Sequence, residues 1–258
     1  MSEHLVTEIA PSLVSPQFED RKQQKESATL GMWVFLATEV LFFGGLFATY
    51  TIYRHLWPTA FRQGSLDLKW YLGGFNTGVL LLSSFCMAMA VHAAATGSNP
   101  GIVRWLTLTI VVGGVFLVIK GTEYYIEYKE HLVPGLNFST TKPDESQVGP
   151  LVRGLDRFEE WFDRLTGQEE AIQREAPWPE QRKPQEELFM LFYFIMTCIH
   201  ATHMIIGICV MLVLIAMARR RAFSAKYHNP VEMFGLYWHF VDIVWVFLFP
   251  TLYLLRQP

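Results

Sequence analysis

The sequence predicts an all-α protein, a polytopic membrane bundle of five transmembrane helices with a long polar insertion between the third and the fourth. Of the 258 residues, 51% are hydrophobic and 15% are aromatic. The mean hydropathy is nevertheless only +0.22, because the apolar residues gather in blocks between polar stretches. Each block has the roughly 20 residues that a helix needs to cross a bilayer. We place the five helices at about 28–53, 70–95, 103–128, 188–218 and 231–255.

Residues 1–27 precede the first block and are polar, with Arg21, Lys22 and Lys25 among them. We expect them to form a flexible tail that lies partly on the membrane surface. They lack a short apolar core followed by a small-residue cleavage site, which a removable signal peptide would have. The first helix is therefore expected to act as its own insertion signal.

Residues 28–128 hold the first three helices, which carry few polar side chains. Glu39 is the one charge inside the first helix. The second helix is rich in small residues, which suits close contact between membrane helices. The third ends polar, where Lys120, Glu123 and Glu127 follow one another at intervals of about one turn. We expect Lys120 and Glu123 to form an ion pair at the outer end of the helix, on the surface and of small energetic value.

Residues 129–187 form the polar insertion, which contains six prolines and is too polar to span a membrane. Part of it nevertheless has apolar residues at helical spacing, with acidic residues around them. This pattern predicts a short amphipathic helix that lies on the membrane or on a partner. Its apolar positions are Leu151, Leu155, Phe158, Phe162 and Leu165.

Residues 188–258 hold the last two helices, and the fifth is the most informative part of the chain. At helical spacing, Trp238, Asp242, Trp245 and Phe249 fall on one stripe, and His239 lies one turn before the carboxylate. An ionisable side chain is costly in hydrocarbon and normally faces a bundle interior or a functional pathway. We therefore expect this stripe to face protein.

Basic residues predict the orientation of the bundle. Arg219, Arg220, Arg221 and Lys226 lie in a short loop, which the positive-inside rule places in the cytoplasm. The N-terminus is then also cytoplasmic, and the C-terminus is extracytoplasmic. The insertion at 129–187, with 13 acidic and 8 basic residues, is expected outside as well.

This topology brings several intramembrane polar groups to one depth. Glu39 and Asp242 each lie 11 residues from the cytoplasmic start of their helices, or roughly 16 Å deep at 1.5 Å per residue. His203 reaches a similar level from the opposite direction, with His200 one turn further out and His239 one turn further in. We expect the histidines and Asp242 to form a polar cluster that fixes helix packing. For Glu39, proton handling, lipid contact and a structural role are all open.

No motif in the sequence marks a redox-metal site. The three cysteines, Cys86, Cys198 and Cys209, lie inside apolar blocks and lack the spacing of metal ligands. We expect them to be small buried hydrophobes without a disulfide. A haem would need imidazoles from opposed helices, which His200 and His239 offer by residue type alone.

Five stretches, in order along the chain, resemble subunit III of the haem-copper respiratory oxidases in its five-helix bacterial form. The run from Tyr237 to Trp245 is the most specific of them. The other four are the glutamate-bearing segment 31–43, the helix start 76–81, the Glu123-Tyr124-Tyr125 element and the paired-histidine segment 194–207.

The resemblance implies a non-catalytic subunit in a bacterial inner membrane. The chain would bind no cofactor of its own, because haem and copper reside in oxidase subunits I and II. It would bind phospholipid in a cleft, support proton uptake and protect the catalytic subunit. Glu39 takes the place of the family's buried glutamate, and His200, His203, His239 and Asp242 take the places of its packing residues.

The sequence departs from the family pattern in two respects. The longer form has two additional N-terminal helices that flank the lipid cleft, and the segment 129–187 is longer than the usual connection. Because that segment is acidic and expected outside, we hypothesise that it contacts another subunit or respiratory complex, or attracts a basic electron donor such as cytochrome c. No nucleic-acid partner is expected.

Three other functions compete with an oxidase subunit. One is the related accessory protein of nitric oxide reductase. Another is an independent transporter with Glu39, His203 and Asp242 as a relay, although the sequence has no visible inverted repeat. The third is a haem-binding electron carrier. The sequence does not distinguish cytochrome c from quinol as the electron donor of an oxidase.

Overall fold

The computed structural model describes residues 17–138 apart from 19 and 137, residues 154 and 157, and residues 183–254 apart from 226. Within these residues, five helices are long and apolar enough to cross a membrane, which confirms the predicted all-α polytopic bundle. The apolar positions of the predicted amphipathic helix, from Leu151 to Leu165, lie outside the described residues.

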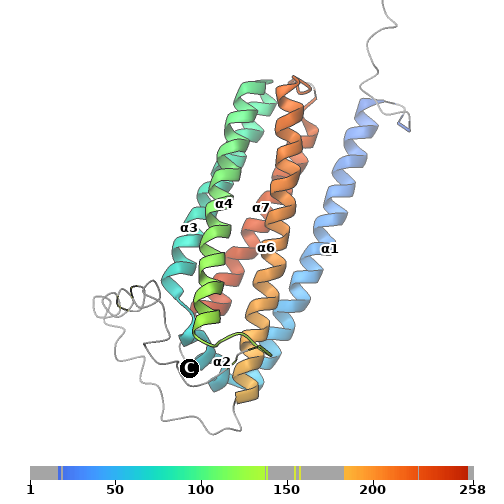
Figure 1. Ribbon diagram of the computed structural model, residues 1–258. Coiled ribbons are helices and arrows are strands. Elements are labelled where there is room, and N and C mark those ends of the chain that lie inside the picture. Colours follow the sequence, from blue (N-terminus) through green and yellow to red (C-terminus); the bar gives the residue numbers. More distant parts are fainter. Residues whose placement is uncertain are drawn as a thin grey trace, which may run out of the picture.

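The helices are α1 (Arg21–Leu56), α2 (Pro58–Asp67), α3 (Trp70–Ala95), α4 (Asn99–Lys129), α6 (Lys183–Arg219) and α7 (Asn229–Phe249), followed by the π-helix η3 (Pro250–Leu254). The long helices run side by side (Figure 1). α7 contacts α1, α3 and α6, so it lies at the centre of the bundle. α1 lies at the edge, where its main contacts are with α7 and α2.

α1 begins earlier than the apolar block that predicted it. Asp20 caps the helix, since its carboxylate accepts a hydrogen bond from the Gln23 backbone N–H at 2.7 Å. Residues 21–27, expected in the tail, therefore form the first two turns. The short helix α2 was not predicted. It follows Trp57, and Pro58 occupies its first turn, where a missing N–H costs nothing.

Large α7 side chains pack against small residues of neighbouring helices. Trp238 lies against Gly113 of α4 and Gly207 of α6, and its indole N–H donates to the Ser83 hydroxyl of α3 at 3.2 Å. Trp238 and Trp245 are fully buried and Asp242 is 3% exposed. These burials confirm that the predicted stripe faces protein, which agrees with the rule that small residues admit close helix contact in membranes.

Candidate functional site: a cleft beside Glu39 and the intramembrane histidines

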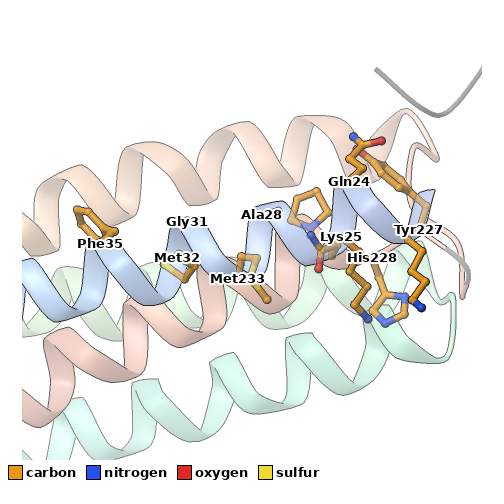
Figure 2. A pocket seen from close by; sticks show the side chains of 12 residues that line it. Gln24, Lys25, Ala28, Gly31, Met32, Phe35, Tyr227, His228 and Met233 are labelled. Atoms are coloured by element: carbon orange, nitrogen blue, oxygen red, sulfur yellow. The ribbon is translucent and has the colours of Figure 1, made fainter. Parts of the chain in front are cut away.

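A cleft of about 760 Å³ opens between the first turns of α1 and the start of α7 (Figure 2). Its charged lining consists of Lys22 and Lys25, with His228 opposite them. Its deeper wall is apolar, formed by Ala28, Met32, Phe35 and Met233. The cleft therefore combines a cationic mouth with an apolar floor.

Glu232 organises the mouth of this cleft from outside its lining. One carboxylate oxygen lies 3.5 Å from Lys25 Nζ, and the other lies 3.1 Å from His228 Nε2. Lys22 lies 3.9 Å from Glu26 and its side chain is 83% exposed. Lys25 thus has an ion-pair partner in Glu232, whereas the exposed Lys22 is only loosely paired.

Glu39 lies about one turn beyond Phe35 on the same face of α1, below the floor of the cleft. Its Oε2 lies 3.2 Å from Nε2 of His203 on α6, a residue 164 positions away. The Glu39 and His203 side chains are 19% and 17% exposed. The sequence placed these residues at one depth, and the structure brings them into contact.

The hydrogen bonds of His203 determine how protons are placed in this pair. Nδ1 lies 2.9 Å from the Ile199 carbonyl, which only accepts, so Nδ1 carries a hydrogen. The short contact between Nε2 and Glu39 then contains one proton, on either the imidazole or the carboxylate. Tyr237 also donates to the His203 carbonyl at 2.9 Å, which ties α7 to this turn of α6. Glu39 and His203 can therefore share a hydrogen bond between α1 and α6.

His200 lies one turn before His203 on α6 but contacts a different helix. Its Nε2 donates to the Val241 carbonyl of α7 at 3.1 Å. The ring packs against Phe116 and Trp245, with centroid distances of 5.5 and 5.1 Å. His200 is fully buried and links α6 to α7.

His239 and Asp242 face α3. His239 Nδ1 and the Ser84 hydroxyl are 2.6 Å apart, and Asp242 also lies beside Ser84. Within the part of the chain that the structure describes, neither Asp242 carboxylate oxygen has a hydrogen bond of good geometry.

The four predicted cluster residues contact three different helices. His203 meets Glu39 of α1, His200 binds a carbonyl of α7, and His239 and Asp242 lie beside Ser84 of α3. His200 and His239 bind different neighbouring helices, so they do not make the opposed pair that a haem would need. Among the described residues there is no group of three or more histidine, cysteine or acidic side chains suited to a metal ion.

Lys120 and Glu123 form the predicted ion pair, with Nζ 2.8 Å from Oε2, but its expected surface position is wrong. The two residues are 2% and 1% exposed. Tyr193 of α6 and Tyr253 of η3 cover them. The local i, i+3 spacing predicted the contact, but it carried no information about these distant tyrosines.

Comparison with known proteins supports the resemblance found in the sequence. A family model described as cytochrome c oxidase subunit III matches residues 185–256. Cytochrome c oxidase subunit 3 of Synechocystis is 29% identical over 226 residues, covering 87% of this chain and 74% of the relative. The corresponding protein of Corynebacterium diphtheriae is 26% identical, covering 95% of this chain and 96% of the relative. Quinol oxidase subunit 3 of Bacillus spizizenii is 25% identical, covering 88% and 86%. These matches confirm the resemblance to oxidase subunit III.

Proposed function

We propose that this chain, a multi-pass membrane protein similar to oxidase subunit III, is the non-catalytic subunit III of a proton-pumping haem-copper oxidase that reduces oxygen to water. It assembles with subunits I and II, which hold the haem and copper. Its own tasks are to stabilise the catalytic subunit, to bind phospholipid and to support proton uptake. The observation that carries this proposal is the Glu39–His203 pair beside a cleft with cationic and apolar parts.

The cleft fits one phospholipid chain and its phosphate. The apolar floor at Ala28, Met32 and Phe35 suits an acyl chain, and Lys22 and Lys25 suit a phosphate at the membrane surface. The two N-terminal helices that flank the cleft in the longer family form are not needed for this site, because α1 and α7 supply its walls.

Glu39 and His203 act as the proton-holding group of the subunit. A further proton can bind Glu39 Oε1 while His203 Nε2 still donates to Oε2, so the pair can take up a proton without breaking its contact. In this proposal the pair takes up a proton from the cleft side and releases it again. Asp242 faces α3, on another side of α7 from this pair, so it is not part of the same relay.

The orientation belongs to the same proposal. The N-terminal residues, the mouth of the cleft and the basic loop at Arg219–Arg221 face the cytoplasm of a bacterium. The C-terminus and the insertion at 129–187 face outside, where the acidic insertion contacts another subunit or a basic electron donor. Deleting residues 140–183 tests the insertion, since unchanged assembly and unchanged salt dependence of donor oxidation would refute its role.

The first experiment is a mild-detergent affinity purification of this chain, with subunit identification and a reduced-minus-oxidised visible spectrum. Large haem- and copper-bearing subunits should accompany the chain, and the spectrum then identifies the oxidase. Partners from a nitric oxide reductase would favour the related accessory role. A chain that purifies alone and colourless would favour an independent transporter, and one that purifies alone and coloured would require a haem ligand.

The second experiment isolates the proton role. Glu39→Gln should leave assembly intact but alter proton uptake by the purified oxidase, most clearly at alkaline pH, where protons are scarce. Glu26→Gln, which removes a carboxylate from the exposed start of the same helix, is the matched control. Turnover and pumping of Glu39→Gln identical to those of Glu26→Gln at alkaline pH would contradict the proton role.

A further inference from the structure

A second group of buried charges lies far from the cleft, near the end of α4. We call it the α4 charge cluster, and it consists of Lys120, Glu123 and Glu127 of α4, Tyr193 of α6 and Tyr253 of η3. No member is more than 3% exposed. α1 starts at the end of the bundle where the cleft opens, and α4 ends at the opposite end (Figure 1). The cluster is therefore separate from Glu39 and its lipid cleft.

Lys120 is fully occupied within the cluster. Its three N–H groups donate to Glu123 Oε2 at 2.8 Å, to the Tyr193 hydroxyl at 2.9 Å and to the Tyr253 hydroxyl at 3.0 Å. Tyr253 in turn donates to Glu123 Oε1 at 2.6 Å. Both Glu123 oxygens are thus bound, and Lys120 has no hydrogen left for another carboxylate.

Glu127 is the member of the cluster that receives no hydrogen bond from Lys120. It lies about one turn beyond Glu123 and is 3% exposed. Neither of its carboxylate oxygens has a hydrogen bond of good geometry among the described residues. Its charged and titratable neighbours are Lys120, Glu123 and Tyr124 of α4, Glu130 just after that helix, Tyr193 of α6 and Tyr253 of η3.

The charges around Glu127 do not balance if it is ionised. Lys120 is one cation for two buried carboxylates, and Glu123 already binds it. Glu130, at the end of the helix, is itself paired with Lys69 at 3.4 Å, so that cation is engaged as well. The Tyr193 hydroxyl is a neutral donor beside Glu127. A buried carboxylate with only a neutral donor and no cation of its own is strongly unfavourable, whereas a neutral carboxylic acid carries its own hydrogen.

We propose that Glu127 binds a proton and is held as a neutral carboxylic acid, so that the α4 charge cluster is a proton-binding site distinct from the Glu39–His203 pair. The site stands on its own contacts and does not depend on the proposed oxidase function. Glu130 lies about one turn further along α4, and its side chain is 14% exposed, so it provides a step between Glu127 and the aqueous phase at this end. The chain then holds one proton site at the middle of α1 and another near the end of α4.

Infrared difference spectroscopy of the purified complex tests this proposal directly. The wild-type minus Glu127→Gln spectrum should lose one carbonyl band of a protonated carboxylic acid, and that band should shift in heavy water. Glu123→Gln is the matched control on the same helix and should instead lose carboxylate bands. Loss of carboxylate bands in the Glu127→Gln spectrum would overturn the proposal, because it would show that Glu127 is ionised.

A stability measurement keeps the test decisive if a spectrum is ambiguous. Gln has nearly the shape of a neutral Glu side chain, so Glu127→Gln should keep the wild-type thermal midpoint. Glu123→Gln should lower it, because it removes the negative charge that is paired with Lys120. Failure of Glu127→Gln to assemble would count against a neutral acid. Replacing sodium and potassium by choline should leave the wild-type midpoint unchanged. A midpoint that depends on either ion would show that a metal cation, not a proton, balances Glu127.

Discussion

Gly207→Ala is predicted to loosen the centre of the bundle. A Cβ atom at this position would lie 2.7 Å from Trp238 Cζ3, 3.0 Å from Trp238 Cε3 and 3.2 Å from Tyr237 Cε1. Trp238 has little room to move away. Gly113 closes its other side, where a Cβ would meet the same indole at 3.2 Å, and its N–H donates to Ser83.

The expected cost follows from this contact. Adding a methyl group to a tightly packed interior costs about 1–3 kcal/mol, while Ala in place of Gly returns up to ~1 kcal/mol of helix propensity. Gly114→Ala separates the two effects, because a Cβ at Gly114 meets nothing within 4 Å. Both substitutions gain the propensity term, so the difference between the two variants measures the overpacking alone.

The assay is thermal unfolding of the purified complex in mild detergent, followed by tryptophan fluorescence. Gly207→Ala should unfold at a lower temperature than Gly114→Ala, and Gly114→Ala should match or exceed the wild type. Equal midpoints for the two glycine variants would refute the argument that Trp238 is held rigidly between α4 and α6.

Two further substitutions probe the polar contacts. Lys120→Met should destabilise the bundle by about 3–5 kcal/mol, since it leaves the buried Glu123 carboxylate without its cation. Lys22→Met, at an exposed position, should change the unfolding midpoint little. Similar midpoints for the two variants would show that the buried pair is dispensable. Tyr237→Phe should lower the free energy of unfolding by about 1 kcal/mol, because it deletes one hydrogen bond to the His203 carbonyl. An unfolding midpoint equal to that of the wild type would show that this bond does not hold α7 to α6.

The membrane bundle was predictable because its signals are local. The length of an apolar block predicts a spanning helix, and the spacing from Trp238 to Phe249 predicts which face of the last helix is buried. The packing partners were not predictable in this way. Trp238 rests on two glycines and a serine from three other helices, and nothing near residue 238 identifies them.

The candidate sites show the same limit. The number of residues from each helix start predicted that Glu39 and His203 lie at one depth. Whether they touch depends on the rotation of each helix about its axis, and that rotation turns Asp242 toward α3. The cleft was missed because its α1 wall begins at residues whose polar composition indicated a tail. Lys120 and Glu123 were predicted on the surface, but two tyrosines bury them. These lie 73 and 133 positions after Lys120, so the local sequence could not indicate them.

The central position of α7 has a consequence for biogenesis. α3 and α4 are neighbours in sequence and pack on each other, so this hairpin can form as soon as both have entered the membrane. α1 has its main long-helix contact with α7, which is synthesised after the other four long helices. Until α7 leaves the ribosome, α1 lacks its main long-helix contact, and the glycine faces of α4 and α6 lack Trp238. The centre of the bundle is therefore packed last, when its final helix enters the membrane.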